Sequence, residues 1–458
     1  MQRAILAASC AAAFAAPPPI PRGGPPLTRG VSGLTDQEIP DTLLASDPAS
    51  LQARYAAERV RLAPGNRRYN LFWTSFENAA PLPAPGACPP AHELVPANET
   101  DRVARGYHAF HCYSTAALEQ TGALLALDAS IGAVSTAIVY GAPDFAISPN
   151  CTGFPWPPNP NFRLGCLPWD YMDAWEDYIN LLSERWPSLG FCVWNEIQSL
   201  GWSDPSPRLP NRFTTAPMFS PAQLAVYADA IATLFERAAR ASARHTPDGV
   251  PVMLWLSTDH FTVAPPLKPG DVGHLGLYEF LDAFWPRLAA ADFAWGVAVH
   301  PYDAGDPRQD LSARGIYTFA TLQRLVADVQ CDHLVALGAA RADCGKYAQM
   351  QMWASEQGWP QSPSMNKTLQ ARNICLAHRL SLAQGVWSVT HNTFQSATPS
   401  SQGGSGDFSL IDEPPLCDVR LAHCDGRETW DAYTSLPVGT WGVSSAHYCC
   451  TRWGEGCA

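Results

Sequence analysis

Charged side chains are scarce in this chain of 458 residues: 16% are Asp, Glu, Lys or Arg, whereas 47% are hydrophobic. A chain this apolar is expected to fold and not to be disordered. Acidic residues outnumber basic ones by 42 to 30, which gives a formal net charge of −12. This balance argues against a nucleic acid or an anionic membrane surface as the partner. It also disfavours a strongly anionic polysaccharide, unless a local basic groove overrides it.

Several functional signatures are missing as well. No run of 18 or more apolar residues follows the N-terminal segment, so the sequence predicts no membrane span. The chain has no Gly-x-Ser-x-Gly nucleophile elbow. The glycines of residues 401–406 are not followed by Lys-Ser/Thr, which makes a phosphate-binding loop a weak hypothesis.

Histidine spacing gives no support for a metal site. Asp259, His260, His300, Asp303 and His391 could in principle form a metal cluster. However, no His-x-His or His-x-x-x-His pair occurs in the chain. We therefore expect no metal and no other cofactor.

The N-terminus resembles a secretory signal peptide. Arg3 precedes an apolar segment, residues 4–16, in which residues 13–15 have the small-x-small pattern of a cleavage site. We expect residues 1–16 to be removed on export; a buried helix or an organelle transit peptide are the alternatives. Residues 17–30 are rich in Pro and Gly and are expected to form a flexible leader.

Cysteines and sequons agree with export. The chain has 14 cysteines, and so many in a secreted protein imply disulfides with one or more thiols left free. Cys192 lies in an apolar, strand-like run and is the best candidate for a free buried thiol. Sequons at Asn98, Asn150 and Asn366 would be glycosylated on the same route. We expect a secreted, extracellular glycoprotein that is a monomer.

Strand-like and helix-like segments alternate along most of the chain. Strands are expected at 68–75, 133–140, 191–194, 252–257, 293–300, 349–355 and 385–390, and helices at 48–61, 115–127, 170–186, 221–244, 278–288, 319–330 and 367–383. One further strand near Val31 would bring the count to eight. Such alternation makes a parallel sheet. The predicted fold class is α/β, a (β/α)8 TIM barrel over residues 31–397.

Some segments depart from this alternation. Residues 77–105, 141–168 and 200–220 are expected to be long loops that shape a cleft. Residues 398–458 are rich in Ser, Gly and Cys. We expect them to form a Cys-rich C-terminal extension packed on the barrel, with a separate small domain as the alternative.

Two of the expected strands end in glutamates that are far apart in the sequence. The apolar run 191–194 leads directly into Asn195 and Glu196, and residues 350–354 lead into Ser355 and Glu356. The carboxyl ends of barrel strands form one ligand-binding face. Two carboxyl groups about 5 Å apart, one protonated and one ionised, are required for retaining hydrolysis of a glycosidic bond. We therefore interpret the chain as one that brings Glu196 and Glu356 together across a sugar ring.

These strand ends resemble those of a known group. Trp194-Asn195-Glu196 and Ser355-Glu356-x-Gly358 resemble the two signature strand ends of the clan A retaining glycoside hydrolases, which are (β/α)8 barrels. The resemblance implies that Glu196 is the general acid/base at the end of strand 4 and that Glu356 is the nucleophile at the end of strand 7. Asn195 would hold the sugar 2-hydroxyl, a contact that strengthens in the transition state.

A third segment, residues 298–302 (Ala-Val-His-Pro-Tyr), is similar to the clan's strand 6 end. The resemblance implies that Tyr302 donates to the nucleophile and lowers its pKa, and that His300 lies beside the sugar or the acid/base. The sequence also departs from the clan. The run that would end strand 2, residues 74–77, lacks the arginine that several families place near the nucleophile, and Ile197 stands where many members have proline.

Other residues could line a sugar-binding cleft. Trp202 and Trp359 flank the site strands and could stack on sugar rings, and Asp259 and His260 follow strand 5. His391 lies near the expected end of strand 8.

The sequence thus predicts a secreted, retaining O-glycosyl hydrolase whose substrate is an oligo- or polysaccharide. The alternative is a non-catalytic carbohydrate-binding or cell-surface protein on a glycosidase-like barrel.

Overall fold

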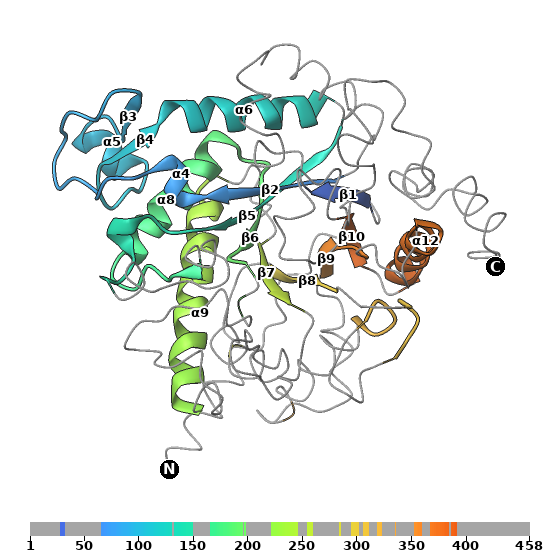
Figure 1. The fold of residues 1–458 in the computed structure, drawn as a ribbon. Helices are drawn as coiled ribbons and strands as arrows, with labels where there is room; N and C mark the ends of the chain where they lie inside the picture. The colour runs from blue at the N-terminus through green and yellow to red at the C-terminus, as the bar shows by residue number, and fades with distance from the viewer. Residues whose placement is uncertain are drawn as a thin grey trace.

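Eight parallel strands form a closed barrel in the computed structural model, hydrogen-bonded in the order β1-β10-β9-β8-β7-β6-β5-β2 (Figure 1). Their bounds are β1 (Thr28–Ser32), β2 (Asn66–Phe72), β5 (Val134–Tyr140), β6 (Gly190–Val193), β7 (Leu254–Asp259), β8 (Trp295–His300), β9 (Met352–Gln357) and β10 (Val386–His391). The predicted α/β barrel is therefore present, and the first strand lies close to the expected position. It begins at Thr28, within the predicted leader.

The structure describes only part of the chain. The described residues are 28–32, 66–130, 132–149, 165–195, 197, 221–245, 254–259, 284, 295–301, 306–310, 318–322, 335, 352–359, 367–383 and 386–391. The expected signal peptide, the helix at 48–61 and the Cys-rich extension lie outside these residues. Most of the helices expected at 278–288 and 319–330 lie outside them as well.

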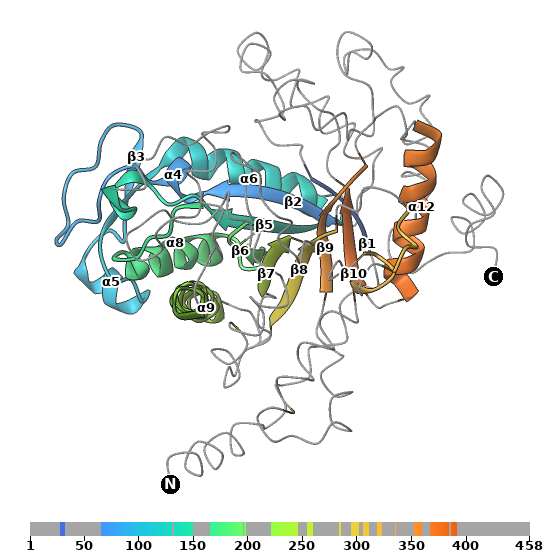
Figure 2. The same cartoon turned by 60° about the horizontal axis from the view of Figure 1, so that its bottom comes forward.

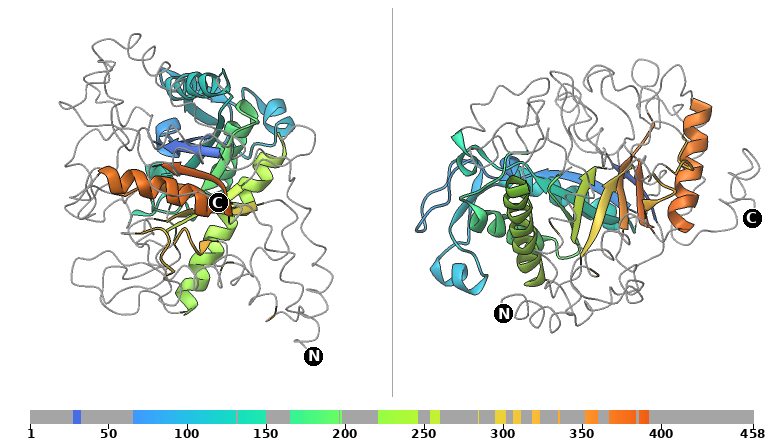
Figure 3. Two further views of the ribbon diagram at one scale, coloured as in Figure 1. Left: turned by 90° about the vertical axis from the view of Figure 1, so that its right-hand side faces the viewer. Right: turned by 90° about the horizontal axis from the view of Figure 1, so that it is seen from below.

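Long helices pack around the outside of the barrel. They are α6 (Thr115–Ser130), α8 (Met172–Arg185), α9 (Pro221–Ala243) and α12 (Lys367–Ala383). Figure 2 shows α8 and α9 on one side of the barrel and α12 beside β10 on the other, and the right-hand view of Figure 3 shows the same separation of α9 from α12. All four helices were predicted from sequence to within a few residues.

The alternation of side chains along β2 separates the inside of the barrel from the outside. Tyr69 donates a hydrogen bond to Asp128, on helix α6, and Arg67 lies 3.8 Å from the same carboxylate. Arg68, between them, instead reaches Glu356 on β9. Because β9 is not a neighbour of β2 in the barrel, Arg68 crosses the interior. Successive residues of a strand point to opposite faces, so one strand serves both the packing layer and the site.

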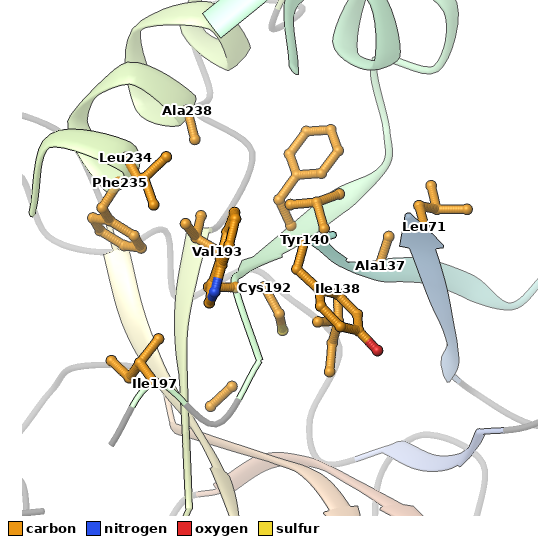
Figure 4. Packing of buried hydrophobic residues seen from close by; sticks show 14 of the residues in the cluster. Leu71, Ala137, Ile138, Tyr140, Cys192, Val193, Ile197, Leu234, Phe235 and Ala238 are labelled. Atoms are coloured by element: carbon orange, nitrogen blue, oxygen red, sulfur yellow. The ribbon is translucent and has the colours of Figure 1, made fainter. Parts of the chain in front are cut away.

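Apolar packing fixes β6 against α9. Val193 is fully buried, and Figure 4 shows Leu234 and Ala238 of α9 on the same side of β6 as Val193. The indole N–H of Trp175, on α8, donates to the Leu234 carbonyl oxygen at 2.9 Å, which ties α8 to α9. Cys192 is a free, buried cysteine, as predicted, and burial raises the pKa of its thiol.

A buried carboxylate strengthens the contact between α8 and α9. Glu176 of α8 is fully buried and lies 2.9 Å from Nη1 of Arg237 and 3.4 Å from Nε2 of His108. Arg244, which directly follows α9, donates to its other oxygen. Burial alone would raise the pKa of Glu176, but hydrogen bonds from His108 and Arg237 lower it to about 2. The ionised carboxylate of Glu176 therefore links the two helices through ion pairs.

The segment 77–105 is not the long loop that the sequence predicted. It contains β3 (His92–Val95) and α5 (Glu99–Ala104), and β3 pairs antiparallel with β4 (His111–Ser114). The disulfide between Cys88 and Cys112 ties the segment to β4, and Cys166 and Cys375 are also disulfide-bonded. Asn98 caps α5 by accepting from the Asp101 N–H at 2.9 Å, a capping pattern that the sequence did contain. The strand expected at 68–75 also ends earlier, at Phe72, where the short helix α4 (Trp73–Phe76) begins.

A buried imidazole connects β4 to helix α8 and to the residue that follows α4. Nδ1 of His111, on β4, lies 2.7 Å from Oε1 of Glu77, and its Nε2 lies 2.9 Å from Oδ2 of Asp177 on α8. Glu77 directly follows α4, and its Oε2 accepts from the Trp73 indole N–H at 2.9 Å. The Tyr113 ring stacks on His111 with 5.3 Å between centroids. His111, Glu77 and Asp177 are almost or fully inaccessible to solvent, so this cluster joins three separate elements in the core.

Candidate active site

Glu356 lies in β9, close to the carboxyl end of the strand, with 16% of its side chain exposed. Arg68 Nη1 donates to Glu356 Oε2 at 2.6 Å and to the Ser355 carbonyl oxygen at 3.0 Å. Arg68 Nη2 donates to Asn70 Oδ1 at 3.2 Å, which orients the guanidinium. A buried cation this close favours the ionised form of the carboxylate. Glu356 is thus held as a partly accessible anion, which can serve as a nucleophile or as an electrostatic stabiliser.

His300 lies beside the same carboxylate. It is the last residue of β8 and is fully buried, and its Nδ1 is 3.5 Å from Glu356 Oε2. The structure therefore brings together two of the residues singled out in the sequence, from strands β8 and β9. Asp259, at the end of β7, is the register partner of His300, so its backbone reaches the same level of the barrel.

The end of β6 has a strained backbone. Trp194 follows the strand with a φ of 61°, an unusual conformation for a bulky residue that clusters at functional sites. Its N–H still donates to the Val139 carbonyl oxygen at 2.9 Å, and its buried ring packs edge-on against Trp175 with 5.7 Å between centroids. The turn at Trp194 changes the direction of the chain immediately before Asn195, which is 7% exposed.

Most of the other predicted site residues are not among the described residues. Glu196, Tyr302, Trp202 and His260 lie outside the described residues. His391 is the last residue of β10 and is the backbone register partner of Gln357 in β9 and of Val31 in β1.

Trp359 has a different setting from the one expected. Its side chain is fully buried, with 6.1 Å between its ring centroid and that of Phe319. Its carbonyl oxygen accepts from Gln370 Nε2, on α12, at 2.6 Å. These contacts make Trp359 a core residue that fixes the chain just after β9, and a ring without exposed surface has no face on which a sugar could stack.

Arg68 is the site residue that the sequence interpretation missed. The sequence predicts that strand 2 ends at residues 74–77, a run that contains no arginine. The strand instead ends at Phe72, and the arginine that meets Glu356 lies within it. A signal was available: an arginine inside a buried strand needs a partner, and alternation places residue 68 on the face opposite Tyr69.

Within the described ranges, no set of three or more His, Cys, Asp or Glu side chains is arranged to hold a metal ion. In the same part of the chain, no helix combines the length and apolar character needed to cross a membrane.

Sequence comparison finds no relative: no known family model matches the chain, and no curated protein matches its sequence. Comparison of structures does find likenesses. A β-glycosidase from Pyrococcus horikoshii is 10% identical with a TM-score of 0.52, and the match covers 95% of this chain and 98% of that one. The GH39 enzyme from Xanthomonas axonopodis pv. citri is 13% identical with a TM-score of 0.50, over 90% of this chain and 67% of that one.

A third similar structure is a family 39 glycoside hydrolase from the gut symbiont Bacteroides cellulosilyticus WH2. It is 16% identical with a TM-score of 0.45, and the match covers 90% of this chain and 63% of that one. The present chain therefore spans less than two thirds of the length of that enzyme. The first two likenesses show that the chain shares its barrel fold with these two glycoside hydrolases.

Proposed function

We propose that this protein is a glycoside hydrolase that cleaves O-glycosidic bonds of an oligo- or polysaccharide with retention of anomeric configuration. The observation that carries the proposal is the ion pair between Glu356 and Arg68, 2.6 Å apart at the carboxyl end of β9. The pair supplies an ionised carboxylate on a rigid strand. The likeness to a β-glycosidase supports a β-linked sugar as the substrate class.

In the proposed reaction, Glu356 is the nucleophile and Glu196 is the general acid and base. Glu356 attacks the anomeric carbon while Glu196 gives its proton to the leaving glycosidic oxygen, so that a covalent glycosyl ester forms on Glu356. Glu196 then takes a proton from a water molecule, which attacks the same carbon and releases the sugar and the free carboxylate. Glu196 follows Asn195 directly in the chain, and β6 and β9 are separated by β7 and β8 in the barrel. This arrangement supports an approach of the two carboxyl groups from different strands.

The other residues are proposed to bind the sugar or to tune the carboxylates. Asn195 would hold the 2-hydroxyl, and His300 and Tyr302 would contact Glu356 or the sugar. Trp202, Asp259, His260 and His391 would line the cleft. We also propose that the protein is secreted, which the disulfide between Cys88 and Cys112 supports because disulfides persist in oxidising compartments.

The acid/base role is tested by replacing Glu196 with alanine. The variant should lose turnover of substrates with poor leaving groups but keep formation of the glycosyl ester from 2,4-dinitrophenyl β-glycosides, whose leaving group needs no protonation. Added azide should then restore turnover and give a β-glycosyl azide, which can be identified by NMR spectroscopy. If azide neither raises the rate nor appears in the product, Glu196 is not the acid/base.

The ion pair itself is tested by replacing Arg68 with lysine. Lysine keeps the positive charge but lacks the planar fork that bonds Glu356, the Ser355 carbonyl and Asn70 at once. We expect kcat on aryl β-glycosides to fall by roughly 10²-fold, since a group that positions and stabilises charge typically contributes this much. KM should change little. An unchanged kcat in a folded Arg68→Lys protein would exclude a role for the guanidinium fork.

A further inference from the structure

A cleft of about 320 Å³ lies on the outer flank of the barrel, between α6, the C-terminal end of α8 and β3. Its size falls at the lower end of the range of ligand pockets, about 300–1,000 Å³. Trp186, Arg185, Glu93, Glu119 and Gly122 are among its lining residues. Because α6 and α8 lie outside the barrel (Figure 2), this cleft is separate from Glu356, which meets Arg68 in the interior.

The indole of Trp186 is half-buried and borders the cleft. Trp186 caps α8, and its backbone N–H donates to the Leu182 carbonyl oxygen at 2.9 Å. Gly122 lies opposite, in the middle of α6, where glycine is less favourable than alanine. A methyl group at Gly122 would lie 3.7 Å from both Cζ2 and Nε1 of the indole. A methyl group at this position would therefore make ordinary van der Waals contact with the edge of the indole, which the glycine leaves uncovered.

Polar groups surround this ring. Arg185 donates to Glu93, and the two side chains are 38% and 35% exposed. Glu119 is exposed on the first turns of α6. Carboxylates accept hydrogen bonds and a guanidinium donates them, so together they match the hydroxyl groups of a sugar. Two carboxylates against one guanidinium make an anionic ligand unfavourable.

We propose that this cleft is a second carbohydrate-binding site, which holds part of a neutral polysaccharide chain by apolar contact with the uncovered edge of Trp186 and by hydrogen bonding to Glu93, Glu119 and Arg185. The C–H groups of a pyranose ring present an apolar surface that can pack against an aromatic side chain. The site would tether the protein to a polymer while another segment occupies the barrel. The inference rests on the proposed glycosidase function, because only a polymeric substrate is long enough to occupy the active site and this distant cleft at the same time.

The test uses native electrophoresis of the full-length protein through gels that contain hydroxyethyl cellulose, xylan or glucomannan at several concentrations. Retardation gives a dissociation constant for each polymer. Trp186→Ala removes the ring, and Gly122→Leu places an aliphatic side chain against the uncovered edge of the indole while favouring the helix. Val103→Ala is the matched control, since Val103 is 68% exposed on α5 and does not line the cleft. Turnover of 4-nitrophenyl β-glycosides, which occupy only the active site, is measured in parallel.

We expect retardation of the unmodified protein and of Val103→Ala by at least one polymer, and a dissociation constant about tenfold weaker in both cleft variants. Turnover of the aryl glycosides should be unchanged. Equal retardation of all four proteins, or no retardation of the unmodified protein by any of the three polymers, would overturn the proposal. If the cleft variants lose retardation while no protein cleaves an aryl glycoside, the binding site stands and the catalytic proposal fails.

Discussion

Replacing Glu356 with glutamine is expected to lower kcat on aryl β-glycosides by about 10⁴-fold or more, the order found when a covalent nucleophile is removed. Glutamine has the same shape and keeps an oxygen that can accept from Arg68, but its neutral amide cannot form the glycosyl ester. The measurement is the initial rate with 4-nitrophenyl β-glycosides, together with mass spectrometry of the intact protein after brief exposure to 2-deoxy-2-fluoro glycosyl fluorides. The unmodified protein should gain one glycosyl group, and the variant should gain none.

A loss of activity in this variant has to be separated from a loss of fold. The substitution removes the negative charge that Glu356 presents to the buried Arg68, so we expect a cost of about 1–3 kcal/mol in the free energy of unfolding. Circular dichroism and chemical denaturation measure this cost directly. Glu99→Gln is a suitable control, because Glu99 is an exposed residue that pairs with Arg102 on the protein surface. Full turnover by a Glu356→Gln protein would exclude Glu356 as the nucleophile.

The strand ends could be predicted because local sequence dictates them. Short apolar runs without turn residues define β6 and β9, and in each case the polar residue at the carboxyl end is the one that a barrel exposes to ligand. Glu356 and His300 could therefore be expected at the same face of the barrel, with His300 beside the sugar or the acid/base as the resemblance implies. The structure places His300 Nδ1 3.5 Å from Glu356 Oε2.

The remaining features depend on contacts between distant segments. β3 forms only by pairing with β4, and single-sequence patterns carry little information about such a partner. The partnership of Arg68 with Glu356 depends on the register of β2, because a shift by one residue would turn the arginine to the outside. The left-handed backbone of Trp194 is held by the packing of its ring on Trp175. Packing between distant segments here stabilises a backbone conformation that tryptophan itself disfavours, and the sequence does not show this.

The imidazole of His111 shows a further consequence of tertiary packing. Burial by itself would lower the pKa of His111, but the charges and hydrogen bonds of Glu77 and Asp177 raise it to about 9. The ring is thus expected to be protonated at neutral pH, between two carboxylates that belong to α8 and to the end of α4. Protonation gives both ring nitrogens a hydrogen to donate, which is why one imidazole can satisfy two buried acids. No pattern of spacing in the sequence would reveal this.

Replacing His111 with phenylalanine should lower the free energy of unfolding by about 3–5 kcal/mol near neutral pH, because Glu77 and Asp177 would face each other in the core without a cation. A folded-state pKa of about 9 lies above the ordinary value of about 6.5, so the stabilisation is fully present below about pH 6.5 and is lost as the pH rises through about 9. The difference between the variant and the unmodified protein should therefore be largest near pH 6 and smaller near pH 10, as measured by chemical denaturation. His92→Phe, at a more exposed position on β3, should have little effect at either pH. A His111→Phe protein as stable as the unmodified one at low pH would show that β3 and β4 do not depend on the positive charge of His111. The disulfide and the apolar contacts would then suffice to hold these strands in place.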